Sequence, residues 1–250
     1  MERDKILAFI NEYLRINDFN DLCPNGLQVA GTEKIYKIIT AVSASVALFE
    51  KAIELKADTI IVHHGIIWDF ERPRYVGGYR ERLRLLLGHD LNLLAYHLPL
   101  DAHPVIGNNA RLADMLKLKN LEPFGDYKGN YIGVRGEIKP LSSHLFFKNV
   151  EDMIGREPII FPYGPETVSR IGIISGGAQK EVRQAVDAGL HVYITGEVSE
   201  HNMYYAQEEH IHFVSAGHYA TERFGVKALG SLLEDKFDLN VTYVDIDNPV

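Results

Sequence analysis

Cysteine is nearly absent from this sequence of 250 residues, which contains Cys23 alone. A single cysteine excludes an intrachain disulfide and a zinc cluster built on thiolates. Cys23 lies in the turn-like segment Leu-Cys-Pro-Asn-Gly with no obvious base beside it. This setting favours a structural role over that of a nucleophile.

Long apolar runs are also missing. No stretch approaches the length of a membrane span, and the opening segment Met-Glu-Arg-Asp-Lys has no apolar signal region. We therefore expect a cytoplasmic protein with no membrane association.

Positive charge is in the minority. The chain has 26 Lys and Arg against 34 Asp and Glu, which gives a formal net charge of -8. Such a chain gains nothing from phosphate-backbone electrostatics, so we do not expect a nucleic-acid partner. The densest basic stretch, residues 72–84, is accompanied by Glu71 and Glu81 and is typical of a solvated helix face.

The pattern of apolar residues predicts an α/β protein. Hydrophobic residues make up 46% of the chain, enough for the core of one large domain or two small ones. Residues 21–31, rich in Pro, Asn and Gly, are expected to form a loop. Elsewhere strands and helices alternate, which implies βαβ units and mostly parallel sheets. The expected strands are residues 37–42, 58–62, 91–96, 131–137, 170–174, 191–195, 211–215 and 239–245. The expected helices are an amphipathic helix at the start and residues 46–56, 79–87, 108–118, 142–153, 179–188, 199–208 and 220–233.

The second half of the chain repeats the first. At an offset of 132 residues, the strand ending in His63 and His64 aligns with the one ending in Thr195 and Gly196. We expect two similar, interlinked α/β units, residues 1–128 and 129–250, with a metal site between them and a last strand able to cross back to the first unit. The alternative is that strand-loop-helix units resemble one another in any protein.

Two adjacent histidines, His63 and His64, end the apolar run Asp-Thr-Ile-Ile-Val-His-His-Gly. The run predicts a buried strand. Open α/β sheets bind ligands at the carboxyl ends of their strands. Two imidazoles at this position therefore favour a polar site over packing.

Two further segments supply candidate ligands after predicted strands. The first contains His97 and Asp101, and the second contains His218 and Glu222, whose spacing of four puts both on one helix face. Imidazole nitrogen and carboxylate oxygen suit Zn, Fe, Mn or Ni. The set is too large for one tetrahedral ion and suits two, the arrangement used in metal-assisted hydrolysis.

Each piece also has a structural interpretation. Adjacent histidines are often structural, an aspartate after a strand can cap a helix, and a His-x-x-x-Glu pair is usually a surface pair. Their joint placement at strand ends is what favours a metal site. Five other histidines have no further candidate ligands near them in the sequence, and we interpret them as surface or packing residues: His144, His191, His201, His210 and His212. The segment before His201 allows this residue to approach the site.

The ordered motifs resemble those of the Nif-three-like (Ngg-interacting factor) family, whose members are often labelled GTP cyclohydrolase 1 type 2 homologs. The motifs are Asn-Gly-Leu-Gln, His-His-Gly, Tyr-His-x-Pro-Leu-Asp-Ala-His with Gly-Asn-Asn-Ala after it, Ser-Gly-Gly-Ala, Thr-Gly-Glu and Gly-His-Tyr-x-Thr-Glu. The resemblance runs from about residue 5 to the end and fits the short form of the family. It implies a ring-shaped homohexamer and two divalent transition metal ions per chain, held by His63, His64, Asp101, His218 and Glu222.

The resemblance leaves the reaction open. A first hypothesis is a metal-dependent hydrolase of a cyclic amide or nucleotide-like small molecule, with His97 as the acid or base. His97 could equally give a hydrogen bond that supports the ligands. A second hypothesis is a metal-binding chaperone or regulatory protein without turnover, and a third, disfavoured by the acidic balance, is nucleic-acid binding. The Ser175-Gly-Gly turn is either an anion cradle or a plain tight turn, and Glu197 either supports the site or lies on the surface.

Overall fold

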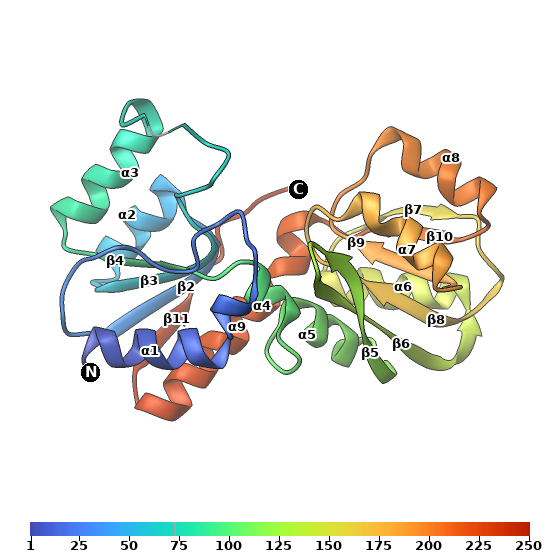
Figure 1. The fold of residues 1–250 in the computed structure, drawn as a ribbon, viewed down its shortest axis with the longest axis horizontal. Coiled ribbons are helices and arrows are strands. Elements are labelled where there is room, and N and C mark those ends of the chain that lie inside the picture. Colours follow the sequence, from blue (N-terminus) through green and yellow to red (C-terminus); the bar gives the residue numbers. More distant parts are fainter. Residues whose placement is uncertain (73) are drawn as a thin grey trace. The chain divides into compact units, whose positions relative to one another are not determined.

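The computed structural model describes residues 1–72 and 74–250. The chain folds into two compact units, each with its own sheet (Figure 1). Unit 1 comprises Met1–Leu100 and Gly225–Asp247, and unit 2 comprises Asp101–Phe224 and Asn248–Val250. The chain thus first passes from unit 1 to unit 2 after residue 100, whereas the expected boundary was residue 128. The residues that follow the boundary contact elements of unit 2.

Unit 1 is built on a five-stranded sheet. Its strands, in spatial order, are β1 (Gly26–Val29), β4 (Asn92–Ala95), β3 (Thr59–His64), β2 (Lys37–Ser43) and β11 (Asn240–Tyr243). All except β1 are parallel. The strand near the C-terminus, β11, pairs with β2 of the first sheet. The central strands β3 and β4 are buried almost throughout, as expected where helices cover both faces of a sheet.

Helices cover both faces of this sheet (Figure 1). On one face lie α2 (Val46–Glu54) and α3 (Gly77–Gly88), and on the other lie α1 (Arg3–Tyr13) and the unit 1 part of α9 (His218–Phe237). Helix α2 begins after Ser45, whose hydroxyl accepts a hydrogen bond from the Leu48 N–H at 3.2 Å. Helix α9 packs closely on the sheet because Gly230 leaves room for Thr40 and Val241.

Unit 2 is built on a six-stranded sheet. Its strands, in spatial order, are β5 (Lys119–Tyr127), β6 (Asn130–Ser142), β8 (Thr167–Ile173), β9 (Val192–Thr195), β10 (His212–Ser215) and β7 (Ile159–Pro162). Strands β8, β9 and β10 are parallel. One face carries α5 (Asn108–Met115) and α6 (Ser143–Ile154), and the other carries α7 (Val182–Asp187) and α8 (Glu200–Glu208) (Figure 1). The predicted α/β class with mostly parallel strands is confirmed.

The strand register reproduces the internal repeat. In unit 1, Ile39 of β2 lies opposite Ile60 of β3, and in unit 2, Ile171 of β8 lies opposite Val192 of β9. Both residues of the second pair follow those of the first by the same 132 positions found in the sequence. The two units therefore share a β-α-β core with equivalent registers.

Three strands and one α-helix were not expected from the sequence. They are β1, β5, β7 and the single-turn helix α4 (Leu98–Ala102). The three strands lie at sheet edges, and β5 is exposed along its first five residues. The apolar periodicity of these edge strands is weak, because each is held by one neighbouring strand and not by a buried face. Among the described residues, no helix combines the length and apolar character needed to cross a membrane.

The Asn92 side chain links β4 to the segment that follows β1. Its hydrogen bonds predict how much this residue stabilises the fold. The buried side chain accepts from the Gly31 N–H at 2.8 Å and donates to the Thr32 carbonyl at 3.0 Å. Asn92→Ala leaves both groups without this partner, so we expect unfolding free energy to fall by about 2 kcal/mol in urea denaturation. Asn240→Ala, at an exposed strand position, should change it by less than about 0.5 kcal/mol. Equal effects would contradict this role.

Candidate metal centre

Three histidines of unit 1 gather at the carboxyl ends of two neighbouring strands. His63 and His64 end β3, and His97 follows β4 by two residues. The ring centroid of His63 lies 4.6 Å from that of His64 and 5.1 Å from that of His97. One ring nitrogen from each of the three lies within 4.8 Å of the others, close enough to hold a metal ion.

Buried hydrogen bonds orient these rings. Nδ1 of His63 lies 2.9 Å from the carbonyl oxygen of Tyr96. A carbonyl only accepts, so Nδ1 donates and the lone pair of the neutral ring is on Nε2. Nδ1 of His97 likewise donates to the carboxylate of Asp21 at 2.7 Å. Both rings are thus prepared to offer Nε2 to an ion or a proton.

Asp21 contacts the candidate site and was not singled out from the sequence. Its side chain is 3% exposed, and besides His97 it accepts from the Leu98 N–H and from Asn25, both at 2.9 Å. Burial raises the pKa of Asp21, but the hydrogen bonds of His97 and Asn25 outweigh this and lower it to about 2. The signal was present in the sequence, because Asp21 directly precedes the Leu-Cys-Pro-Asn-Gly motif.

The overlapping Asn-Gly-Leu-Gln motif holds the loop after the histidine pair. The side-chain oxygen of Gln28 accepts from the Ile66 N–H at 2.8 Å and from the Ile67 N–H at 3.2 Å. A Cβ atom at Gly65 would overlap this amide, so the approach requires glycine. Cys23 is fully buried beside it, and burial raises its pKa to about 11, which fits a structural role.

Unit 2 contributes two carboxylates and a fourth histidine. Carboxylate oxygens of Asp101 and Glu222 lie within 4.8 Å of one another, and both residues are buried. Asp101 accepts from the Asn108 amide at 2.8 Å and from the Ser175 hydroxyl at 3.0 Å. Nε2 of His218 lies 3.1 Å from Glu222, one turn along α9 as their spacing predicts. This group provides both nitrogen and oxygen ligand atoms.

Glu197 orients His218 as Asp21 orients His97. Its carboxylate accepts from Nδ1 of His218 at 2.7 Å. Burial lowers the pKa of His218, but the charges and hydrogen bonds of Glu222 and Glu197 raise it to about 9. Of the two interpretations left open for Glu197, the supporting one agrees with this contact.

The Ser175-Gly-Gly turn is a structural turn. The Ser175 N–H donates to the Asn109 side chain at 2.7 Å, and the Gly176 N–H donates to the Thr221 hydroxyl at 3.0 Å. The Ala178 N–H also has a partner, the Thr195 hydroxyl at 3.3 Å. These amides are therefore committed to the protein, which favours a tight turn over an anion cradle.

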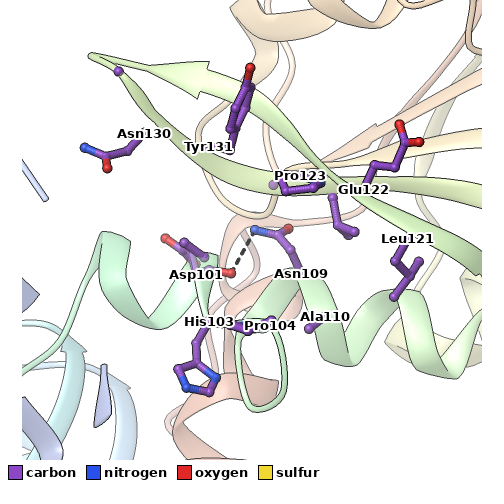
Figure 2. A pocket seen from close by; sticks show the side chains of 14 residues that line it. Asp101, His103, Pro104, Asn109, Ala110, Leu121, Glu122, Pro123, Asn130 and Tyr131 are labelled. Carbon is purple, nitrogen blue, oxygen red and sulfur yellow. Dashed lines mark hydrogen bonds between the residues drawn. The ribbon is translucent and has the colours of Figure 1, made fainter. Parts of the chain in front are cut away.

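A pocket of about 430 Å³ lies beside Asp101 in unit 2. Figure 2 shows its lining, with Tyr131 at one wall and the Asn109 amide bonded to the Asp101 backbone carbonyl. Apolar side chains of β5 and α5, among them Leu121 and Ala110, complete it. Pockets of this volume and mixed lining commonly take small molecules.

Comparison with known proteins agrees with this arrangement of elements and motifs. Residues 1–249 match the Duf34/NIF3 (NGG1p interacting factor 3) family. The chain belongs to this family. A Haemophilus influenzae protein named GTP cyclohydrolase 1 type 2 homolog is 46% identical over the full length of both chains. Among solved structures, protein ybgI, described as of unknown function, is 42% identical with a TM-score of 0.95, and a Thermus thermophilus protein is 34% identical with a TM-score of 0.92, each with full coverage of both chains.

The Duf34/NIF3 chain thus brings its predicted ligands together as two groups, one in each unit. His63, His64 and His97 form the first, and Asp101, His218 and Glu222 form the second. The five histidines set aside in the sequence lie outside these groups. His191 and His212 accept hydrogen bonds from backbone N–H groups, and His144 and His201 are exposed.

Gly176 is required by the position of Glu222, which gives a stability prediction. A Cβ atom at Gly176, where φ is +66°, would overlap the Glu222 carboxylate. We expect Gly176→Ala to lower unfolding free energy by at least about 2 kcal/mol. Gly129→Ala is the matched control, since φ is +88° and no atom lies within 4 Å of its Cβ position. If both variants lose the same amount in urea denaturation, backbone strain alone accounts for Gly176.

The low pKa of Asp21 predicts a pH-dependent contribution to stability. Because its pKa is about 2 in the folded chain and 3.8 ordinarily, the ionised form stabilises the fold above pH 4. We expect Asp21→Asn to cost about 2 kcal/mol at pH 7. This difference from the parent chain should shrink as the pH falls from 4 to 2. Asp187→Asn, at an exposed helix end, should show no such trend, and a constant Asp21 difference would exclude the charge as its cause.

Proposed function

We propose that the chain binds two divalent transition metal ions, Zn, Fe, Mn or Ni, through His63, His64, Asp101, His218 and Glu222. The observation that carries the proposal is the grouping of imidazole nitrogens and carboxylate oxygens within each unit. Nδ1 of His63 donates to a backbone carbonyl, which puts the lone pair of its neutral ring on Nε2. Nε2 of His218 lies 3.1 Å from the Glu222 carboxylate, close enough for the two to hold one ion. Nitrogen and carboxylate donors in this proportion suit these metals.

The function that this centre supports best is hydrolysis of a cyclic amide or nucleotide-like small molecule. When bound, a pair of such ions lowers the pKa of water and polarises the bond to be cleaved. In this proposal His97 transfers the proton through Nε2, and the Asp21 carboxylate, which accepts from Nδ1, stabilises the ring while it holds the proton. The pocket beside Asp101 is large enough for such a substrate.

The names of relatives point in the same direction. Proteins over 40% identical carry the name GTP cyclohydrolase 1 type 2 homolog, and opening of a purine ring is hydrolysis of a cyclic amidine-like bond. We also propose a cytoplasmic homohexamer without a nucleic-acid partner, on the basis of the family resemblance, the single cysteine and the net charge of -8.

Elemental analysis tests the metal proposal. We expect close to two transition metal ions per purified chain, and His63→Ala and Glu222→Ala should each lower the content because each removes a ligand. His144→Ala, an exposed histidine on α6, is the control and should leave it unchanged. Unchanged content in both site variants would exclude the centre. Full metal content without hydrolysis of any cyclic amide or nucleotide tested would favour the non-catalytic alternative.

A further inference from the structure

An aromatic layer continues outward from the histidines of unit 1. The ring of Trp68 lies 5.2 Å from that of His97 and 5.9 Å from that of His64, measured between centroids. Phe70 follows, 5.6 Å from Trp68 and inclined to it by 32°. Trp68 is half-buried, whereas Phe70 is 67% exposed. The layer therefore runs from the candidate ligands to the surface.

The segment that carries these rings is anchored at several points. The Trp68 indole N–H donates to the Gly65 carbonyl at 3.2 Å, and the Asp69 N–H donates to the Leu22 carbonyl at 2.9 Å. Gln28 holds the two residues that precede Trp68. The rings are thus positioned before any ligand arrives, which lowers the entropy lost on binding.

We propose that Trp68 and Phe70 form a stacking surface for a planar nitrogen heterocycle, such as a purine, presented by the substrate. An exposed phenyl ring next to a half-buried indole offers π surface to a flat ligand, and stacking accepts any base. A ring stacked there would lie beside His64 and His97, where its carbon–nitrogen bonds meet the reacting groups. The inference rests on the proposed function for its assignment to a substrate site.

Phe70 is the better residue to alter, because it contacts Trp68 and is two residues farther from the histidine pair. Replacing Trp68 would also disturb the packing of two histidines. Trp68 is the only tryptophan in the chain, so its fluorescence reports on this site alone. Guanosine serves as the probe, and ribose serves as the matched compound without an aromatic ring.

The test is a titration of Trp68 emission with guanosine, using the full chain with and without added metal. We expect saturable quenching by guanosine and none by ribose. Phe70→Ala should weaken binding by about 5- to 100-fold, and Phe70→Leu should recover only part of the loss because it lacks a π face. Tyr36→Ala, equally exposed at 68%, should bind like the parent chain.

Several results would overturn the proposal. They are the absence of quenching, full recovery in Phe70→Leu, and unaltered affinity in Phe70→Ala. A change in assembly mass for Phe70→Ala in light scattering would assign the ring to a subunit contact instead. Failure of the proposed function looks different, because Phe70-dependent quenching by guanosine would persist in a chain that binds no metal or hydrolyses nothing, and that result would support the stacking surface.

Discussion

A hydrogen bond at one nitrogen of an imidazole ring fixes the tautomer and the orientation in which the other nitrogen meets a ligand, and polar contacts near the candidate ligands follow from this constraint. Each of the four histidines has a partner at Nδ1. For His63 it is a backbone carbonyl, for His64 the Ser43 hydroxyl, and for His97 and His218 a carboxylate. A carboxylate that accepts an imidazole N–H away from bulk water needs further hydrogen-bond donors or partial exposure to solvent. Residues remote in sequence are thereby drawn to the strand ends.

Close packing of polar groups around the candidate ligands explains one glycine in each unit. Gly65 lets the Gln28 amide reach the loop after the histidine pair, and Gly176 lets the Glu222 carboxylate lie against a turn. Any larger residue would move a group whose position decides the geometry of a ligand. In the His-His-Gly and Ser-Gly-Gly motifs, glycine thus leaves room for a neighbouring side chain, in addition to allowing the chain to turn.

Apolar periodicity and residue order predict the buried strands and the internal repeat. Buried parallel strands produce apolar runs, so the strands leading to His63 and His97, and the register of the repeat, follow from residue order. Edge strand β5 and helix α4 leave no such pattern, because neighbours in space and not a buried face hold them. The contact of Asp21 with His97 was not predicted, and Glu197 was left open between two interpretations. A carboxylate 76 residues from its histidine carries no local signal of that pairing.

The repeat puts different residue types at equivalent strand ends of the two units. Position 63 in unit 1 corresponds to Thr195 in unit 2, and the Thr195 hydroxyl donates to the Gly176 carbonyl at 3.1 Å. Thr195 thus stabilises the turn that packs against Glu222, while His63 faces the other histidines directly. Equivalent strand ends thus carry a candidate ligand in one unit and a support for a candidate ligand in the other. A duplicated scaffold can hold an asymmetric set of ligands because the strand register fixes positions and not residue types.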